Sequence, residues 1–126
     1  MISTKDFNPV TDPKLLCTCG DPRCDRRSVN QPTLNRLQVV RDKKNAPMGV
    51  TSGGRCQYHP DELARTTPAD HQKGDGVDVS CSGADRGNLV MWGIEAGFNA
   101  IGVAKTFVHL GRRDELPPGH LTMWVY

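Results

Sequence analysis

The residues best suited to chemistry in this sequence are two histidines and one aspartate. His71 and Asp78 are seven positions apart, with two glycines between them. Because glycine adopts backbone conformations that other residues avoid, this segment could curl and bring the imidazole and the carboxylate together. His109 comes later, in an apolar run where strand alternation would put it on one face with Phe107. Two histidines and one carboxylate, with a water, form the ligand set of a catalytic zinc site that keeps one position open.

The spacing alone can also arise without any function. A histidine and an aspartate seven positions apart occur often by chance, and a histidine on the surface of a protein is usually only solvated. On spacing alone a chance match is the more common case, so both interpretations stay open at this point.

Helices and short strands are predicted to position these residues. An apolar residue at every third position from Leu34 to Val40, after Pro32, predicts an amphipathic helix that ends near Asn45. Short apolar runs bounded by Gly, Pro and polar residues predict strands at residues 48–52, 77–79, 101–103, 106–110 and 121–126.

A second helix is expected to stop at Gly97, with Val90, Ile94 and Phe98 on one face. Residues 55–75 are polar and without periodicity, so we expect an irregular connection there. Connections of this length are usually functional or mobile.

The composition fits one domain. The chain has 126 residues and a mass of 13.8 kDa, and its 13 glycines and 9 prolines predict short elements and long loops. We therefore expect a small single domain of the α+β class, with a mainly antiparallel sheet, two main helices and long loops. Residues 1–31 are expected to form an irregular N-terminal arm, and residues 32–126 the domain that carries the site.

Charge and hydropathy argue against several classes of partner. A net charge of +2 is too small to indicate nucleic-acid binding. No apolar stretch approaches the ~18 residues of a membrane span, and the first residues lack the apolar core of a secretory signal. We expect a monomer that is made in the cytoplasm and has neither nucleic-acid nor membrane partners. The five cysteines, an odd number, are expected to be reduced there.

Four short segments, taken in order, resemble the M15 family of zinc peptidases, which includes D-alanyl-D-alanine carboxypeptidases and phage endolysins. The segments are Thr51-Ser-Gly-Gly-Arg55, His71-x6-Asp78, Gly102-Val103 and Phe107-Val-His109. In order and separation they are similar to the family's Ser-Gly-aromatic-Arg segment, its His-x6-Asp segment and its late histidine after a hydrophobic pair. The resemblance covers roughly residues 15–126.

The resemblance implies that His71, Asp78 and His109 bind one catalytic zinc ion, and that Arg55 binds a substrate carboxylate or carbonyl oxygen. Arginine suits both tasks, because its planar fork binds a carboxylate through two hydrogen bonds and can stabilise an oxyanion. The implied reaction is hydrolysis of a peptide bond next to a D-amino acid in the stem peptide of peptidoglycan, by a carboxypeptidase or an endopeptidase. The small chain is then expected to act on the cell wall as a phage lysis or tail-associated protein. Activity should fall below about pH 6, as the ligand imidazoles take up protons.

The sequence departs from the family pattern where the general base is expected. Members carry an acidic residue three positions before the last histidine or an aspartate two positions after it, and these positions are Thr106 and Gly111 here. Strand alternation near the ligands would turn Asp75 away from Asp78. Other departures are at Gly54, Ala69 and Gly76. The candidate replacements for the base are Asp75, Asp114, Glu115 and His120.

The cysteines near the start offer a second metal-binding pattern. The run Cys17-x-Cys19-x4-Cys24 contains one pair within the spacing of structural zinc sites, and Cys56 or His59 could complete the set. No second close pair follows, so the alternative is a group of small buried or partly buried thiols.

Two rival hypotheses to an active peptidase stay open. One is a catalytically impaired zinc-binding domain on the same fold, which the departures at Thr106 and Gly111 motivate. The other is a small Cys-containing interaction module, in which the match of His71 and Asp78 to the family is accidental. Replacing His71 by Ala removes zinc binding under the first hypothesis and has no effect on zinc under the second.

Overall fold

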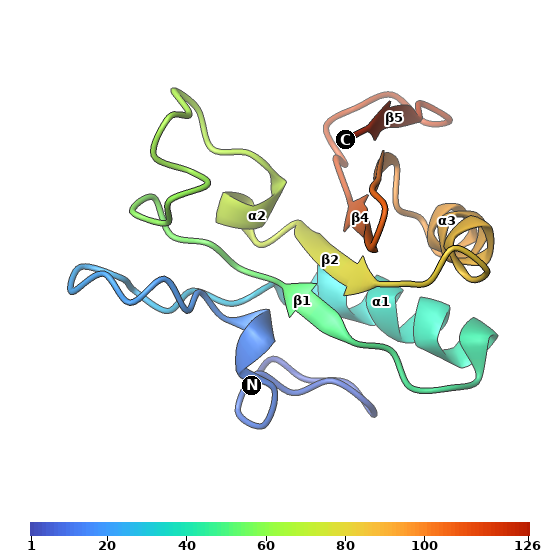
Figure 1. The fold of residues 1–126 in the computed structure, drawn as a ribbon, viewed down its shortest axis with the longest axis horizontal. Coiled ribbons are helices and arrows are strands. Elements are labelled where there is room, and N and C mark those ends of the chain that lie inside the picture. Colours follow the sequence, from blue (N-terminus) through green and yellow to red (C-terminus); the bar gives the residue numbers. More distant parts are fainter.

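The computed structural model describes residues 1–126 and has the expected α+β class (Figure 1). One sheet has the strand order β1-β2-β4-β3-β5; its neighbours are antiparallel except β3 and β5, which run parallel. The mainly antiparallel sheet is therefore confirmed. The elements in chain order are η1 (Pro13–Leu15), α1 (Gln31–Lys44), β1 (Val50–Ser52), α2 (Asp70–Lys73), β2 (Gly76–Ser80), α3 (Arg86–Glu95), β3 (Ala100–Val103), β4 (Phe107–Gly111) and β5 (Thr122–Val125).

Helix α1 begins and ends at residues whose local chemistry favours a helix boundary. The side chain of Asn30 accepts a hydrogen bond from the backbone N–H of Thr33, and proline stands at the start of the helix, where its missing N–H costs nothing. Asn45 ends the helix in the left-handed conformation, with φ of 54°. The helix has the extent that the spacing of its leucines and valines predicts.

Helix α3 turns a different face to the core than its pattern predicts. Ile94 is 39% exposed, whereas Leu89 is fully buried. Gly93 is also buried, and a Cβ there would lie 2.6 Å from a methyl group of Leu110 in β4. The helix therefore rests closely on the sheet through a glycine, a position that a pattern of apolar side chains does not mark. Gly97 follows the helix with φ of 101°, as expected for its stop.

The sheet separates the core from a polar face. Helices α1 and α3 pack against each other and cover one face (Figure 1). Strand alternation makes Val77 and Val79 of β2 and Val108 and Leu110 of β4 point into this core, where all four are fully buried. The alternate positions of the same strands therefore face the other side.

Residues of the N-terminal arm are part of the core. Leu15, Cys17 and Val29 are each at most 1% exposed, and an antiparallel bridge joins Leu16 to Ser28. The arm therefore contributes to the hydrophobic core together with the helices and the sheet. None of the helices is long and apolar enough to cross a membrane.

Candidate metal centre

The two sheet-borne members of the site are cross-strand neighbours. The register of the antiparallel pair β2 and β4 sets Asp78 directly opposite His109, on the face that the helices do not cover. Cross-strand neighbours of this kind have their Cβ atoms about 4.5–5.5 Å apart, close enough for the side chains to meet. Both side chains are nonetheless buried, with residue exposures of 6% and 3%.

His71 comes from α2, a short helix within the segment expected to be irregular. Gly74 ends this helix in the left-handed conformation, with φ of 76°, and its N–H donates to the carbonyl oxygen of His71. The chain then reverses into β2, which brings His71 over Asp78. The glycine between the two residues thus has the role that the sequence suggests for it.

Three ligand atoms of these residues meet at one point. His71 Nε2 lies 3.2 Å from Asp78 Oδ1 and 3.2 Å from His109 Nδ1, and the latter lies 3.0 Å from Asp78 Oδ1. Zinc binds nitrogen and oxygen at about 2.0–2.2 Å in a tetrahedron, whose edges are then about 3.3 Å. The spacing of the three atoms therefore fits one face of a zinc tetrahedron.

Each imidazole ring makes a hydrogen bond on the side away from the centre, and this bond determines which of its nitrogens carries the proton. His71 Nδ1 lies 2.7 Å from the carbonyl oxygen of Gly53, which can only accept, so this nitrogen carries a proton. His109 Nε2 lies 2.9 Å from the carboxylate of Asp70 and donates in the same way. In the neutral rings the inner nitrogens are then unprotonated. Together with Asp78 Oδ1 they form three electron-rich atoms that repel one another unless a cation lies between them.

Asp70 supports His109 from outside the centre. Its carboxylate also accepts hydrogen bonds from Arg113, at 3.0 and 3.2 Å. Burial alone would raise the pKa of Asp70, but the hydrogen bonds from His109 and Arg113 outweigh it and lower the pKa to about 2. A carboxylate that accepts from the outer nitrogen of a metal-binding histidine fixes the ring and strengthens the ligand.

The centre also perturbs the protonation of its own members. Burial would raise the pKa of Asp78, yet hydrogen bonds with His109 and His71 hold it below its usual range. Burial would lower the pKa of His109, but hydrogen bonds with Asp70 and Asp78 raise it. In the metal-free protein a proton on His109 therefore competes for the place of a cation.

Asp70 occupies the space where the family pattern has an aspartate after the last histidine. A Cβ at Gly111 would lie 2.5 Å from Asp70 Oδ2 and 2.9 Å from His109 Nε2. A side chain at position 111 and the carboxylate of Asp70 therefore exclude each other. We interpret Asp70 as a carboxylate supplied from α2 that takes over the contact with His109, and the sequence alone offered no signal for it.

Arg55 lies at the edge of the centre, next to β1. Its Nη2 is 3.3 Å from Asp78 Oδ2, its Nη1 is 3.4 Å from Glu62 Oε2, and its Nε donates to Ser52. The guanidinium thus touches the outer oxygen of a candidate ligand. Its side chain is 13% exposed, and it borders the same cavity as the three ligands.

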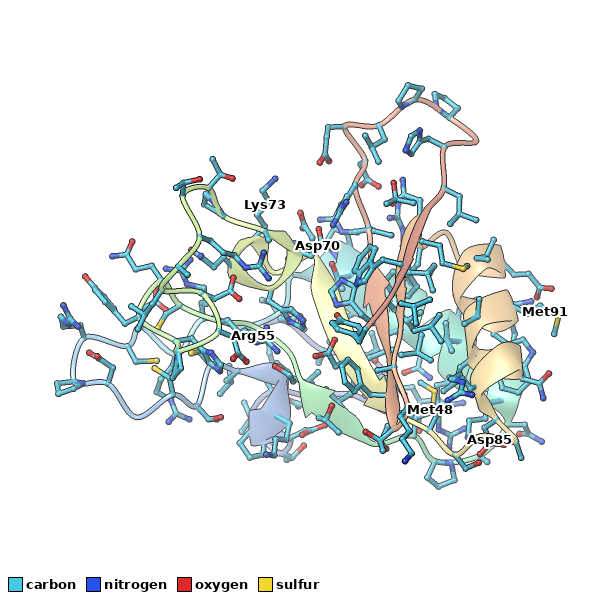
Figure 2. The ribbon with its side chains drawn as sticks, turned by 45° about the horizontal axis from the view of Figure 1, so that its top comes forward. Met48, Arg55, Asp70, Lys73, Asp85 and Met91 are labelled. Atoms are coloured by element: carbon cyan, nitrogen blue, oxygen red, sulfur yellow. The ribbon has the colours of Figure 1, made fainter.

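An open cavity of about 580 Å³ gives access to the centre. Figure 2 labels Arg55 and Asp70, which come from the segment between β1 and β2 and border this cavity. The ring of Trp124 from β5 lies beside His109, with ring centroids 5.4 Å apart. The remaining walls are formed by Asp61, Glu62, Arg65, Ala69, Phe107, Arg113 and Tyr126.

The four candidates for the general base lie outside the walls of this cavity. Asp75 contacts Asn30 and Arg112 on the far side of the β2 start, as strand alternation suggests. Asp114 contacts Arg112 and Arg36, while Glu115 and His120 are exposed. The structure therefore does not bring any of the four together with the ligands.

Glu62 is a buried carboxylate of the cavity wall that the sequence pattern did not reveal. It is 2% exposed, and its Oε1 has no hydrogen-bond partner, although Arg55 and Arg65 both approach the carboxylate. A buried polar atom without a partner is rare and often marks a functional group. Glu62 lies in a polar segment without periodicity, so the sequence does not indicate that it is buried.

The fold and the site define a small α+β domain with an open His-Asp-His site that could bind a metal ion. A family model described as Peptidase M15 matches residues 10–111, which is most of the chain. The chain therefore belongs to the peptidase M15 family, and the resemblance carried by its motifs is confirmed. Members of this family are in general zinc-dependent peptidases. A search of curated proteins finds no match.

Proposed function

We propose that this protein is a zinc-dependent peptidase that hydrolyses a peptide bond next to a D-amino acid in the stem peptides of peptidoglycan. The observation that carries the proposal is the convergence of His71 Nε2, Asp78 Oδ1 and His109 Nδ1 beside an open cavity. Membership of the M15 family supports the peptidase class, and the motif resemblance supports the cell-wall substrate. Action as part of a phage lysis or tail apparatus belongs to the same proposal.

The donor set fits zinc better than the hard divalent cations. Two imidazoles and one carboxylate suit zinc, whereas calcium and magnesium prefer oxygen ligands alone. When bound by His71, Asp78 and His109, zinc supplies a Lewis acid for the scissile carbonyl and lowers the pKa of water toward ~7. The protein supplies the rest of the reaction through the residues of the cavity wall.

The cavity suits a peptide that bears a carboxylate. Three arginines and four carboxylates line it, for a formal charge of −1, which a bound Zn²⁺ changes to +1. Arg55 is placed to hold a substrate oxygen next to the centre, and Arg113 lies over the ring of Trp124 at 5.3 Å. The aromatic wall of Phe107, Trp124 and Tyr126 can pack against the apolar parts of a stem peptide.

We assign proton transfer to Glu62. Of the four carboxylates in the cavity wall, Asp78 is a ligand, Asp70 is held by His109 and Arg113, and Asp61 is mostly exposed. Glu62 is the one that is buried and has an oxygen without a hydrogen-bond partner, with Arg65 Nε 3.3 Å from that oxygen. Arg55 contacts both Glu62 and Asp78, so Glu62 lies one side chain away from the centre. Because a guanidinium stays protonated, the proton would pass to Glu62 through water in the cavity and not through Arg55.

Hydrolysis of purified peptidoglycan with added zinc tests this function. Glu62→Gln should lower the release of peptides by about 10²–10⁴-fold, the usual contribution of a general base, and leave the bound zinc unchanged. Glu115→Gln, outside the cavity, is the matched control and should keep full activity. A fully active Glu62→Gln enzyme would show that the base is another residue.

The same assay separates the rival hypotheses. Wild-type protein that binds zinc but releases no wall peptides would favour the catalytically impaired domain, to which the residues Thr106 and Gly111 point. Wild-type and His71→Ala proteins that both lack zinc at the His-Asp-His centre would favour an interaction module instead.

A further inference from the structure

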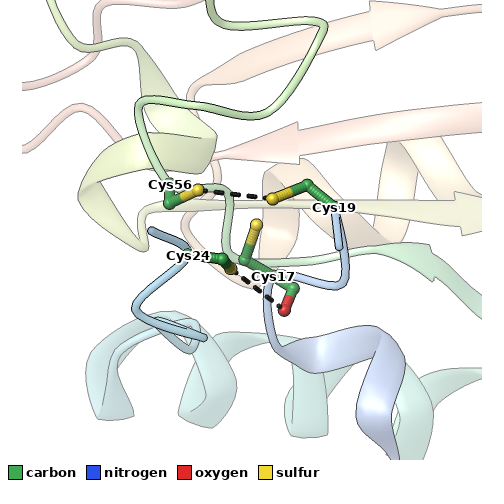
Figure 3. Close-up of side chains that lie close together, drawn as sticks. All are labelled: Cys17, Cys19, Cys24 and Cys56. Atoms are coloured by element: carbon green, nitrogen blue, oxygen red, sulfur yellow. Dashed lines mark hydrogen bonds between the residues drawn. The ribbon is translucent and has the colours of Figure 1, made fainter. Parts of the chain in front are cut away.

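The cysteines near the N-terminus form a cluster that the proposed reaction does not use. Figure 3 shows four of them, three from the N-terminal arm and Cys56 from the segment after β1. The four sulfur atoms all lie within 4.8 Å of one another. The fifth cysteine, Cys81, is not part of this cluster. The members are Cys17, Cys19, Cys24 and Cys56.

We propose that these four cysteines bind a second, structural zinc ion that joins the N-terminal arm to the segment carrying Arg55. A tetrahedral zinc site with four sulfur ligands has Zn–S distances of about 2.3 Å, so its sulfur atoms are about 3.8 Å apart. Cys19 Sγ and Cys56 Sγ are 3.6 Å apart, close to this edge. Four cysteines without an open position are the ligand set of a structural site.

The arm is folded to present its sulfur atoms to one point. The backbone N–H of Cys17 donates to the carbonyl of Arg27 at 2.9 Å, so the residues between them form a closed hairpin. Within it, Arg26 adopts the left-handed conformation, with φ of 53°, and its N–H lies 3.3 Å from Cys24 Sγ. A non-glycine residue in this conformation is strained and persists only where its surroundings require it. The N–H that it directs at a sulfur would stabilise a thiolate.

Close backbone packing holds Cys56 against this hairpin. The N–H of Gly54 donates to the carbonyl of Leu15, and a Cβ at Gly54 would lie 2.2 Å from the carbonyl oxygen of Arg27. The arm and the segment after β1 therefore approach more closely than side chains would allow. Cys17 and Cys56 are each 1% exposed, so two of the sulfur atoms come from buried residues.

Neither disulfides nor a simple group of buried thiols fits the cluster as well as a zinc ion does. A disulfide has a sulfur separation of about 2.05 Å, and the thiols here are free, with Cys19 and Cys56 at 3.6 Å. Burial of thiols alone does not require four sulfur atoms from two separate segments to converge. Binding of Zn²⁺ would release the thiol protons to solvent and replace them with one cation.

Zinc content and X-ray absorption of the reduced full chain test the proposal. The wild-type protein should contain two zinc ions, and the double variant His71→Ala, His109→Ala should retain one. The absorption spectrum of that variant should show only sulfur neighbours, at about 2.3 Å. Cys24→Ser should lose this ion, whereas Cys81→Ser, the matched control, should keep both.

Each outcome separates this site from the His-Asp-His centre. A double variant that is folded and reduced yet holds no zinc would overturn the proposal, as would alkylation and mass spectrometry showing two disulfides in the protein as isolated. If Cys24→Ser does not fold, the zinc content of the wild-type protein and the sulfur neighbours in the X-ray absorption spectrum still test the proposal. A wild-type protein that holds zinc in the cysteine cluster but none in the His-Asp-His centre would support this proposal and count against the peptidase.

Discussion

Asp70 is expected to control zinc affinity without being a ligand. Replacing it by Ala removes the acceptor that lies 2.9 Å from His109 Nε2 and leaves the guanidinium of Arg113 without two contacts. Loss of such a supporting carboxylate usually weakens metal binding by about 10–100-fold, or about 1.4–2.7 kcal/mol. The buried position of Asp70 argues for an effect within this range rather than below it.

A second substitution should restore part of this affinity. Gly111 lies in β4 without a positive φ, so an aspartate meets no backbone strain there. In wild-type protein its Cβ would lie 2.5 Å from Asp70 Oδ2, so Gly111→Asp alone should destabilise the fold. Asp70→Ala removes the clash with Oδ2, and only the His109 ring, whose Nε2 lies 2.9 Å from the new Cβ, then has to shift slightly before it can donate to the new carboxylate. The double variant should therefore bind zinc more tightly than Asp70→Ala.

Competition with a chromogenic chelator measures these affinities directly. Asp114→Ala is the control, because its carboxylate contacts Arg36 and Arg112 away from the cavity, and its zinc affinity should equal that of the wild type. Equal affinities for Asp70→Ala and Asp114→Ala would refute the role given to Asp70. Additive losses in the double variant would refute the exchange between positions 70 and 111.

Three further predictions concern the same centre. Arg55→Ala should lower peptidoglycan hydrolysis by about 10²–10³-fold at saturating zinc; loss of zinc with unchanged turnover of the loaded enzyme would show that Arg55 only orients Asp78. The pKa of His109 is raised in the folded chain, so its protonated form stabilises the metal-free fold. This stabilisation is fully present below the unfolded pKa of about 6.5 and is lost as the pH rises through the folded pKa. Zinc binds only the neutral ring of His109. The difference in Tm between zinc-loaded and chelator-treated protein should therefore increase with pH from about 6.5 upward. A difference that stays constant with pH would argue against a proton at the centre. Gly76→Ala should weaken zinc binding in the chelator assay, because its Cβ would lie 2.8 Å from His109 Cε1; unchanged affinity would mean that the ring shifts freely.

The parts of the fold that could be predicted are those with a local sequence signal. The period of Leu34, Leu37 and Val40 and the caps of α1 depend on neighbouring residues only, and the alternation around His109 correctly separates core from site. The orientation of α3 could not be predicted, because it depends on the contact of Gly93 with Leu110, a residue in a distant strand. The short helix α2 could not be predicted either, because its four residues are too few to show a helical period in the sequence.

The candidate site divides in the same way. The motif indicates His71, Asp78 and His109, but their convergence requires the register of β2 against β4 and the turn at Gly74. The supporting carboxylate of Asp70 could not be predicted from the sequence, because only the folded chain brings Asp70 next to His109. The loop residues proposed for the base are close to the ligands in sequence, yet strand direction leads them away from the cavity.

Diffraction from crystals grown with zinc, recorded on both sides of the zinc absorption edge, tests the central claim most directly. We expect an anomalous peak about 2.0–2.2 Å from His71 Nε2, Asp78 Oδ1 and His109 Nδ1, with one further position open to the cavity. A map without a peak among these three atoms, at a zinc concentration that saturates the protein, would contradict it.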